Sequence, residues 1–323
     1  MLLDRREPAS GVTGDSFAWI GAPGGEVDGS APLRQAVLDD WARLERDVPG
    51  IRVRWSGSLT WGGQTRSNMG DLGSNERVVE PDEIARLEPN LRSPQHRALL
   101  RPTDGAIDAV AVTRALVDAA RRHGAHVRLA ETVRRLRVQN HAVVGVETST
   151  GSIASRAVVL AAGVDVVSLC TAIDVDLPVA ASPAVLMRFN APPGLVRTLV
   201  SSPEVEVRQT EDGLLLAAED YNGEVDHNDL QCSARETLQR LKQTFTGAHD
   251  VRLIEARLGV RPMPIDGLPI IGPLPDRPGG FVAVMHSAVT LAPVAGRLVA
   301  AEVVDGLSSR ELLQVRPHRF TTA

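Results

Sequence analysis

The sequence predicts a mixed α/β protein, α+β in layout, in which two modules interleave along the chain. A helical pattern over 109–123 precedes alternating segments and a fully apolar run at 157–161, which is typical of a buried parallel sheet. Between 185 and 217, short strand patterns are separated by Pro/Gly turns without long helices, as in an antiparallel sheet. A short apolar strand, a tight polar loop and a helix follow within 281–306.

The first hundred residues predict short elements joined by loops. Residues 2–4 end a strand, and the Gly/Ser/Thr-rich segment 5–18 is expected to form a loop. Apolar residues recur every three or four positions over 32–48, which predicts a helix. Apolar and charged residues alternate over 51–55, which predicts a half-buried strand. A strand end and a short helix are expected over 79–91.

The middle of the chain predicts a helix and several strands. The helix over 109–123 is closed by Gly124, because glycine readily adopts the left-handed conformation that ends helices. A second helix is expected over 234–245 and a strand over 251–258. Three alternating segments between the helices predict strands at 126–129, 133–138 and 143–147.

The C-terminal segment predicts a place where negative charge is stabilised. Residues 281–284 form an apolar strand, and 286–290 form a polar loop before a helix. Thr290 is expected to be the helix N-cap, with Pro293 in the first turn, where a missing N–H costs nothing. Because the unpaired N–H groups and the dipole of a helix N-terminus attract anions, this loop is a candidate binding site.

The stretch 261–306 resembles the C-terminal signature of the FAD-dependent amine and amino-acid oxidases, the D-amino-acid oxidase, glycine oxidase and sarcosine oxidase family. The segment 105–163 is also similar to the pattern of that family. The resemblance implies a Rossmann-like FAD-binding domain and a mostly antiparallel substrate domain. It implies hydride removal from a carbon that bears an amine, with the loop before the final helix passing beside the flavin.

The resemblance implies discontinuous domains. The FAD-binding domain is expected to take 1–35, 100–170 and 258–323, and the substrate domain 36–99 and 171–257. The family opens with a strand, a G-x-G-x-x-G loop and a helix, whereas this chain starts at what resembles the second strand. The sequence contains no G-x-G-x-x-G stretch, so we expect the FAD-binding domain to be N-terminally incomplete.

Arg261 and His286 are the candidate catalytic residues. Arginine directly before a proline is held stiffly, and its planar fork can bind a substrate carboxylate at two points. The resemblance implies that role for Arg261; the alternative is a structural arginine, and Arg257 is its rival by spacing. His286 lies in the loop that the resemblance places beside the flavin, where relatives have Gly-His-Ser-Gly. This chain has Met285 and Ala288 at the glycine positions, which narrows the room for a ring.

The candidate cofactor residues come from four segments. By spacing alone Asp4 is a solvated loop acid; the resemblance implies a ligand of the FAD ribose, because a carboxylate can bond a diol there. Small and hydroxyl residues after Asp4 suit close approach to a phosphate or the flavin edge, or a plain loop. The full set is Asp4, Arg5, Thr13, Gly14, Ser16, Val133, Ala162, Gly163, Ser287, Val289, Thr290 and Leu291.

Composition excludes several classes of protein. The formal net charge of −5 argues against a general nucleic-acid binder, and no apolar run approaches the about 18 residues of a membrane span. Cys170 and Cys232 are the only cysteines, so the sequence predicts no disulfide framework, no metal motif and no covalent flavin link. The cytoplasm is the expected location. Tyr221, the only tyrosine, is expected at the surface or in the core.

Three functional alternatives remain open from sequence. The first is an FAD-dependent oxidoreductase that acts on glycine, a D-amino acid, a sarcosine-like amine or a tRNA-bound substrate, with oxygen or another acceptor. The second is a truncated or degenerate, non-catalytic member of the same fold that does not hold FAD tightly. An NAD(P)-dependent enzyme ranks last, because it needs the same glycine loop. The oligomeric state is not visible.

Overall fold

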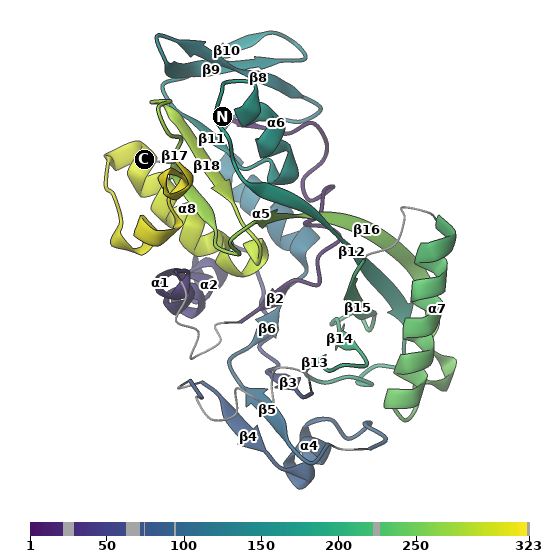
Figure 1. Ribbon diagram of the computed structural model, residues 1–323. Helices are drawn as coiled ribbons and strands as arrows, with labels where there is room; N and C mark the ends of the chain where they lie inside the picture. Colours follow the sequence, from purple (N-terminus) through teal and green to yellow (C-terminus); the bar gives the residue numbers. More distant parts are fainter. Residues whose placement is uncertain (22–28, 63–71, 74, 94, 222–226, 322–323) are drawn as a thin grey trace.

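Helices and strands are mixed along the described part of the chain, as the sequence predicts. A computed structural model describes residues 1–21, 29–62, 72–73, 75–93, 95–221 and 227–321. Its largest element is an eight-stranded sheet beside the long helix α7 (His227–Thr244), while several smaller sheets and the helices α5, α6 and α8 lie at the other end (Figure 1). The predicted mixed fold class is therefore confirmed.

The eight-stranded sheet is antiparallel except where β13 pairs with β3 in parallel. One face packs against α7 and α4 (Pro81–Leu87) through a core that contains Phe189, Phe245 and Trp61. In spatial order the strands are β16 (Arg252–Pro264), β12 (Val179–Asn190), β15 (Leu215–Asp220), β14 (Glu206–Gln209), β13 (Leu199–Ser201), β3 (Ser58–Thr60), β5 (Ala98–Arg101) and β4 (Arg77–Val79).

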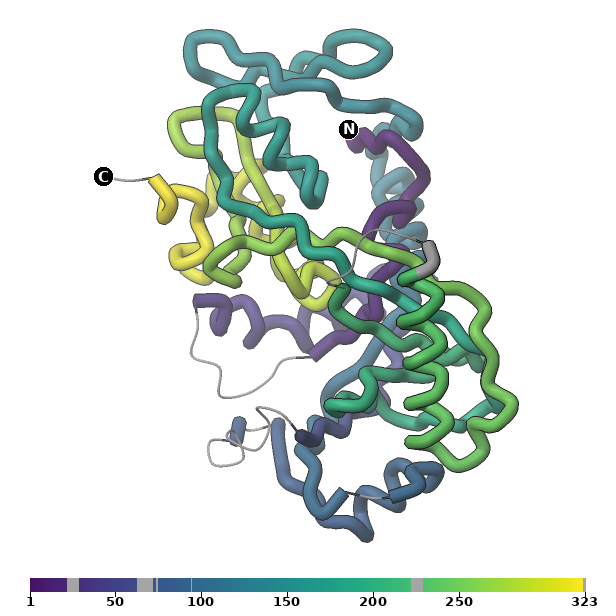
Figure 2. Tube along the Cα trace, turned by 45° about the vertical axis from the view of Figure 1, so that its right-hand side comes forward, coloured from purple at the N-terminus to yellow at the C-terminus, as the bar shows by residue number. Residues whose placement is uncertain are grey.

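The two longest strands connect the ends of the molecule. β12 and β16 pair from Val179 opposite Pro264 to Asn190 opposite Arg252, with a register shift between Arg188 and Phe189. They run as a ribbon out of the large sheet toward the smaller sheets (Figures 1 and 2). Residues near the Pro264 end of this ribbon therefore lie between the two parts of the molecule.

Four smaller sheets and their helices build the other part. In Figure 2 the N-terminal segment runs from the small sheets to the middle of the molecule. Two of the sheets contain parallel pairs, β1 with β7 and β11 with β18. The strands are β1 (Leu2–Leu3) with β7 (Val127–Arg128); β8 (Val133–Gln139), β9 (Ala142–Thr148) and β10 (Ser152–Ala154); β11 (Val158–Leu160), β18 (Gly280–Val284) and β17 (Ile270–Pro273); and β2 (Trp19–Ile20) with β6 (Gly105–Ala106).

The helices of this part are α1 (Ala31–Gln35), α2 (Val37–Asp47), α5 (Ala109–Arg122), α6 (Val166–Thr171) and α8 (Ala288–Asp305). Short 3₁₀ turns span Gly163–Asp165, Ala248–Asp250, Arg310–Val315 and Pro317–Phe320. Asp108 caps α5 by accepting from the N–H groups of Val110 and Ala111, each at 2.9 Å. The predicted helix over 109–123 is confirmed, and Gly124 has the expected positive φ of 87°.

The start of α8 differs from the prediction. Thr290 is not the N-cap, because the helix begins two residues earlier and Ser287 occupies that position with a left-handed φ of 57°. The Thr290 hydroxyl instead donates to the Trp19 carbonyl at 2.8 Å. Pro293 lies inside the helix rather than in its first turn, so the Val289 carbonyl lacks its intrahelical donor.

Three further predictions are wrong in detail. Residues 51–55 form no strand; only Arg54 makes an isolated bridge, to Ala106, because this segment passes the end of the short strand β6. The predicted helix over 32–48 is two helices, since the chain breaks at Ala36 between α1 and α2. The apolar run at 157–161 does form a parallel strand, but Val159 is 42% exposed rather than buried.

No helix within the described ranges is both long enough and apolar enough to cross a bilayer. Cys170 is buried and Cys232 exposed, and both are free thiols. Burial raises the pKa of Cys170 to about 12, so little of this thiol is in the reactive thiolate form near neutral pH. Across the same described residues, no group of three His, Cys, Asp or Glu side chains could hold a metal ion.

Candidate active site

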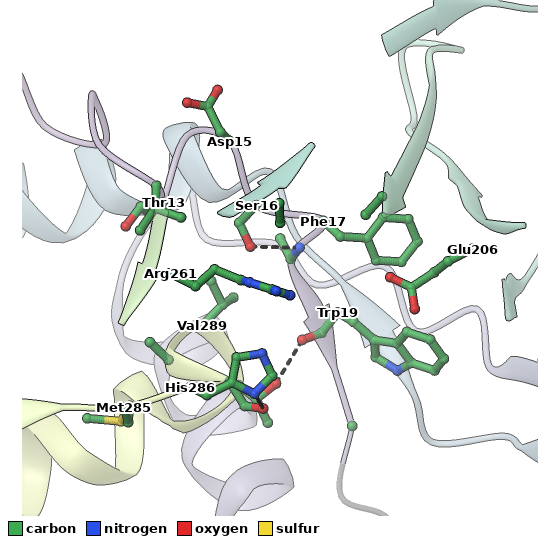
Figure 3. Close-up of a pocket in the computed structure, with 18 of the residues that line it drawn as sticks. Thr13, Asp15, Ser16, Phe17, Trp19, Glu206, Arg261, Met285, His286 and Val289 are labelled. Carbon is green, nitrogen blue, oxygen red and sulfur yellow. Dashed lines mark hydrogen bonds between the residues drawn. The ribbon is translucent and has the colours of Figure 1, made fainter. Parts of the chain in front are cut away.

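A cavity of about 450 Å³ lies where the N-terminal loop, the large sheet and the start of α8 meet (Figure 3). A volume of this size is typical of a site for a small molecule or cofactor. The residues that line it are Val12, Thr13, Asp15, Ser16, Phe17, Ala18, Trp19, Gly21, Arg34, Arg101, Asp104, Ala184, Val185, Glu206, Ala218, Arg261, Pro262, Met285, His286, Ser287, Ala288, Val289 and Thr290.

Three arginines of the large sheet hold the N-terminal loop in place. Arg188 donates to the Gly14 carbonyl at 2.7 Å, and Arg257 pairs with Asp15 at 3.0 Å. The buried Arg208 donates from Nε to the carbonyl of Phe17 at 2.6 Å and from Nη2 to that of Ile107 at 2.9 Å. These contacts join distant strands to one loop, so the large sheet fixes the cavity wall at 12–18.

Trp19 and Asp104 form a polar corner of the cavity. The Trp19 indole donates to Asp104 Oδ2 at 2.9 Å, and Ser58 Oγ donates to the same oxygen at 2.7 Å. Burial raises the pKa of Asp104, and these two hydrogen bonds oppose the rise. Ala18 beside Trp19 has a left-handed φ of 58°, and its N–H donates to Ser16 Oγ at 3.0 Å. A non-glycine residue in that conformation is strained and needs such support.

The first turn of α8 faces the cavity with free N–H donors. No side chain of the described residues caps the helix, and Ala288, Val289 and Thr290 all line the cavity. The Thr290 carbonyl accepts from the Trp41 indole at 3.0 Å, which fixes the turn against α2. A helix N-terminus in this state favours a negatively charged or strongly polarised group.

His286 opens into the cavity, with Ser287 Oγ at 3.4 Å from its Nδ1. The residue is exposed overall, although neighbouring protein atoms remove part of the contact of the ring with water. That desolvation, with the charges of Arg261 and Arg34, lowers the pKa of His286. The imidazole is therefore neutral at pH 7.

Arg261 projects its guanidinium into the cavity (Figure 3). Its Nη2 donates to Ser182 Oγ at 2.8 Å and to Asp220 Oδ1 at 2.7 Å. Nη1 has no hydrogen-bond partner among the described residues, so it is available to a ligand. The rival Arg257 does not line the cavity, because its guanidinium is turned to Asp15.

The structure brings together seven of the candidate residues in this cavity: Arg261, His286, Thr13, Ser16, Ser287, Val289 and Thr290. Gly14 is adjacent to them in the loop, and Leu291 is buried in the core behind the α8 turn. Tyr221 is buried, as the prediction allows.

The other candidates lie away from the cavity, around the end of β1. Asp4 Oδ1 accepts from the Arg6 N–H at 2.8 Å, and Arg5 pairs with Asp165 at 2.8 Å. The Asp4 carbonyl accepts from Glu131 N at 2.9 Å. Val133, at the start of β8, follows two residues after Glu131. Ala162 and Gly163 lead into the 3₁₀ turn that carries Asp165, and a Cβ at Gly163 would meet open space.

Comparisons with known proteins place this arrangement in a family. The family model DAO, described as FAD dependent oxidoreductase, matches residues 1–302. The chain belongs to this family. The resemblance in the sequence is thereby confirmed, and the DAO family is FAD-dependent.

Curated relatives of the chain are identical to it at about a quarter of the aligned residues. One of the subunits of opine oxidase from Agrobacterium tumefaciens (strain Ach5) is 26% identical over 282 residues, which cover 77% of this chain and 71% of that protein. Glycine oxidase of Geobacillus kaustophilus (strain HTA426) is 28% identical over 234 residues, which cover 71% of this chain but 62% of that protein. The chain therefore spans less than two thirds of the length of that glycine oxidase.

Solved structures show the same fold. The crystal structure of glycine oxidase from Geobacillus kaustophilus aligns with a TM-score of 0.87 at 22% identity, covering 99% of this chain and 92% of that one. L-amino acid deaminase from Proteus myxofaciens, solved in complex with anthranilate, gives a TM-score of 0.85 at 18% identity, covering 99% and 88%.

The residues present fit the flavin end of FAD. The uncapped N–H groups at Ala288 and Val289 would hold the polar edge of the ring, because they lack partners among the described residues. The small side chains of Ser16, Ala18 and Ser287 leave the cavity wall accessible to a flat group. Asp4, directly after β1, has a carboxylate that would accept from a ribose diol.

Several cavity residues escaped the sequence-based prediction, among them Trp19, Arg34, Arg101, Asp104 and Glu206. A signal existed for Glu206. Apolar Val205 and Val207 stand on either side of it in the sequence, and both are buried, so the alternation of extended chain turns Glu206 to the opposite face. For Asp104 and Arg101 the sequence shows only a turn.

Proposed function

We propose that this chain oxidises a carbon–nitrogen bond of an amino acid or secondary amine. Bound FAD supplies the electron-accepting ring that takes hydride from the substrate carbon. The observation that carries the proposal is that Arg261 and the uncapped start of α8 open into one cavity. The curated relatives named glycine oxidase, opine oxidase and D-amino acid dehydrogenase support the amino-acid class.

Arg261 holds the substrate carboxylate in this proposal. Its Nη1 is available to a ligand, and Nη2 can be shared with Ser182 and Asp220, so the carboxylate meets a fixed fork. Phe17, Trp19 and Met285 supply the apolar surface that excludes water from the reacting carbon. His286 lies beside the proposed flavin position. Because its lowered pKa favours the neutral imidazole, it places no positive charge near the substrate amine.

The cofactor-binding roles follow the two groups of residues. We assign Thr13, Gly14, Ser16, Ser287, Val289, Thr290 and Leu291 to the flavin end, and Asp4, Arg5, Val133, Ala162 and Gly163 to the adenosine end. We keep the division into an FAD-binding module (1–35, 100–170, 258–323) and a substrate module (36–99, 171–257) as part of the proposal.

The test is a titration of the chain with FAD, followed by anaerobic addition of glycine, D-alanine, L-proline and sarcosine. Retention of flavin absorbance, and its bleaching by one of these compounds, supports the proposal. The second candidate is a non-catalytic member of the fold; the side chains at Met285 and Ala288 and the Asp220 contact on Arg261 favour it. That candidate does not hold FAD tightly, so a chain that shows no flavin absorbance after titration with FAD would support it.

We further propose a reducing compartment such as the cytoplasm, because Cys170 and Cys232 are both free. The expected partner is a small amine or amino acid and not a nucleic acid, in line with the net charge of −5.

A further inference from the structure

A carboxylate, Glu206, faces Arg261 across the cavity (Figure 3). It starts β14, while Val205 before it and Val207 after it are buried in the core of the large sheet. The alternation of the strand therefore directs Glu206 into the cavity. Among the residues that the structure describes, no side chain hydrogen-bonds or ion-pairs with its carboxylate, although the residue is half-buried.

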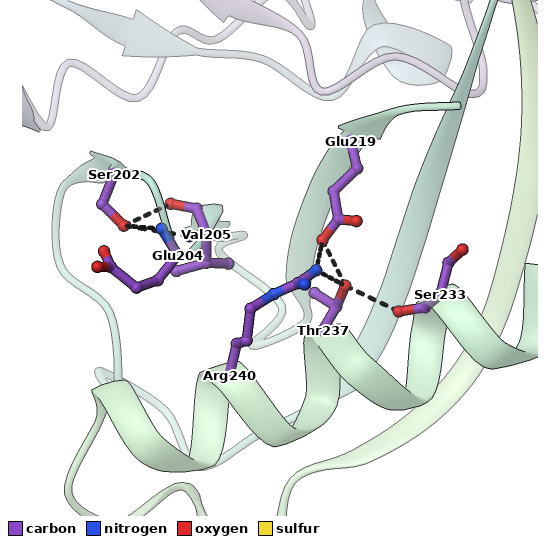
Figure 4. A network of polar contacts seen from close by, with 7 residues as sticks. All are labelled: Ser202, Glu204, Val205, Glu219, Ser233, Thr237 and Arg240. Carbon is purple, nitrogen blue, oxygen red and sulfur yellow. Dashed lines mark hydrogen bonds and ion pairs between the residues drawn. The ribbon is translucent and has the colours of Figure 1, made fainter. Parts of the chain in front are cut away.

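The other carboxylates near the cavity are already engaged. Asp15 pairs with Arg257, Asp104 accepts from Trp19 and Ser58, and Asp220 accepts from Arg261. Glu219 alternates away from Asp220 on β15 and accepts from Thr237 and Arg240 of α7 (Figure 4). Within the described residues, Glu206 is thus the cavity carboxylate with neither oxygen engaged, whereas Asp104 holds Trp19 and Ser58 with Oδ2 and leaves Oδ1 without a partner.

The charges around Glu206 make it a proton acceptor near neutral pH. Burial and the negative charge of Asp220 raise the pKa of Glu206 to about 7, and Arg261 opposes the rise. The other charged or titratable groups that line the cavity are Asp15, Arg34, Arg101, Asp104 and His286. His286 is the poorer acceptor, because burial and the positive charges of Arg261 and Arg34 lower its pKa. A general base works best when its pKa lies near the operating pH.

We propose that Glu206 binds the ammonium group of a zwitterionic amino acid whose carboxylate lies on Arg261, and accepts one proton from it. An N–H bond of the substrate breaks, an O–H bond forms on Glu206, and the electron pair stays on nitrogen. The amine is then neutral before its carbon loses hydride. The inference rests on the proposed function and narrows the substrate to compounds that carry both a carboxylate and an ionisable amine.

The first test compares binding of matched ligands by calorimetry, with FAD present. The pairs are glycine with acetate, D-alanine with propionate, and L-proline with cyclopentanecarboxylate, so each pair differs by the amine. Glu206→Gln keeps the shape of the side chain, and the exposed Glu204→Gln is the matched control. We expect Glu206→Gln to weaken binding of the amino acid about 10- to 100-fold, because a charged hydrogen bond is lost. Binding of the amine-free carboxylate should be unchanged or tighter.

The second test uses opposite pH dependences in the wild-type chain. As pH rises through about 7, Glu206 ionises, so amino-acid binding tightens while binding of the amine-free carboxylate weakens. Glu206→Gln should flatten both curves. If the role of Glu206 were purely structural, Glu206→Gln would weaken the binding of both ligands alike, and its pH curves would run parallel to those of the wild-type chain.

The outcomes separate this inference from the proposed function. If the wild-type chain reduces flavin with an amino acid while Glu206→Gln leaves both binding and pH curves unaltered, Glu206 has no such role and the oxidase function stands. If no amino acid binds to the wild-type chain with FAD, both proposals are wrong.

Discussion

Arg261 donates to the Asp220 carboxylate at 2.7 Å across β12, above Ser182 of that strand. β15 and β16 flank β12 in the sheet, so the side chains of their cavity-side ends meet over the strand between them. The Asp220 side chain is 74% exposed, whereas that of Arg261 is 26% exposed. Asp220 therefore orients the guanidinium, and under the proposed function a substrate carboxylate shares or displaces this contact.

Asp220→Asn should tighten the binding of carboxylate ligands. The variant removes a competing charge but keeps the shape of the side chain. An exposed ion pair contributes about 0.2–1 kcal/mol, so we expect a gain of about 1.5- to 5-fold in affinity for acetate. Calorimetric titration measures it, with Asp118→Asn, from a surface pair on α5, as the control. Weaker binding in Asp220→Asn would mean that the aspartate orients Arg261 more than it competes.

Arg261→Lys should raise KM for an amino-acid substrate about 10- to 100-fold, because a lysine keeps the charge but loses the two-point fork. Flavin content should be unchanged, since Arg261 is assigned to the substrate. Arg252→Lys, at the exposed start of the same strand, is the matched control. An equal loss in kcat with unchanged KM would argue against a carboxylate-binding role.

Arg208→Met should destabilise the chain and loosen the cavity wall. Arg208 is 6% exposed and satisfies the carbonyls of Phe17 and Ile107. Leaving these acceptors without their charged donor costs about 2–3 kcal/mol. Urea unfolding followed by tryptophan fluorescence measures the loss, and Arg197→Met, an exposed arginine, serves as control. An unchanged midpoint would show that the arginine clamp does not stabilise the loop.

Asp40→Asn should destabilise the attachment of α2 to α8 in a pH-dependent way. The Arg297 Nε–H is shared between the two carboxylate oxygens of Asp40, with Nε 3.0 Å from each, and Nη2 donates to Oδ2 at 2.8 Å. Burial opposes ionisation of Asp40, yet the hydrogen bonds from Arg297 and Arg43 hold its pKa below the usual value. The stabilisation is therefore complete above the unfolded pKa of about 4 and is lost as pH falls through the lower folded pKa.

We expect Asp40→Asn to cost about 1–3 kcal/mol near neutral pH, and the difference from wild type to shrink below about pH 4. Urea unfolding across that pH range measures both effects. Asp39→Asn, an exposed neighbour on α2, should show neither. A constant difference between wild type and Asp40→Asn at all pH values would exclude the ion pair as its source.

The elements that local pattern controls were predictable. The helix over 109–123 has an aspartate cap at one end and Gly124 at the other, and the structure has both. The strand at 281–284 lies within β18, and the polar loop after it does lead into α8. These elements were predictable because their periodicity and caps involve residues that are close in sequence.

The start of α8 and much of the cavity depend on distant partners. The Thr290 hydroxyl was expected to cap its helix, but the carbonyl of Trp19, far away in the chain, accepts its proton. Asp220 and Glu206 reach Arg261 only through the pairing of strands in the large sheet. No spacing in the sequence encodes that pairing, so these residues became visible only with the fold.

The most direct measurement of the central claim is anaerobic reduction of the chain loaded with FAD. The account predicts that the chain retains yellow flavin and that an amino acid with a free amine and carboxylate bleaches it, more slowly or at higher concentration in Arg261→Lys. A chain that takes up no flavin, or flavin that only amines without a carboxylate reduce, would contradict a cavity built around Arg261 and the start of α8.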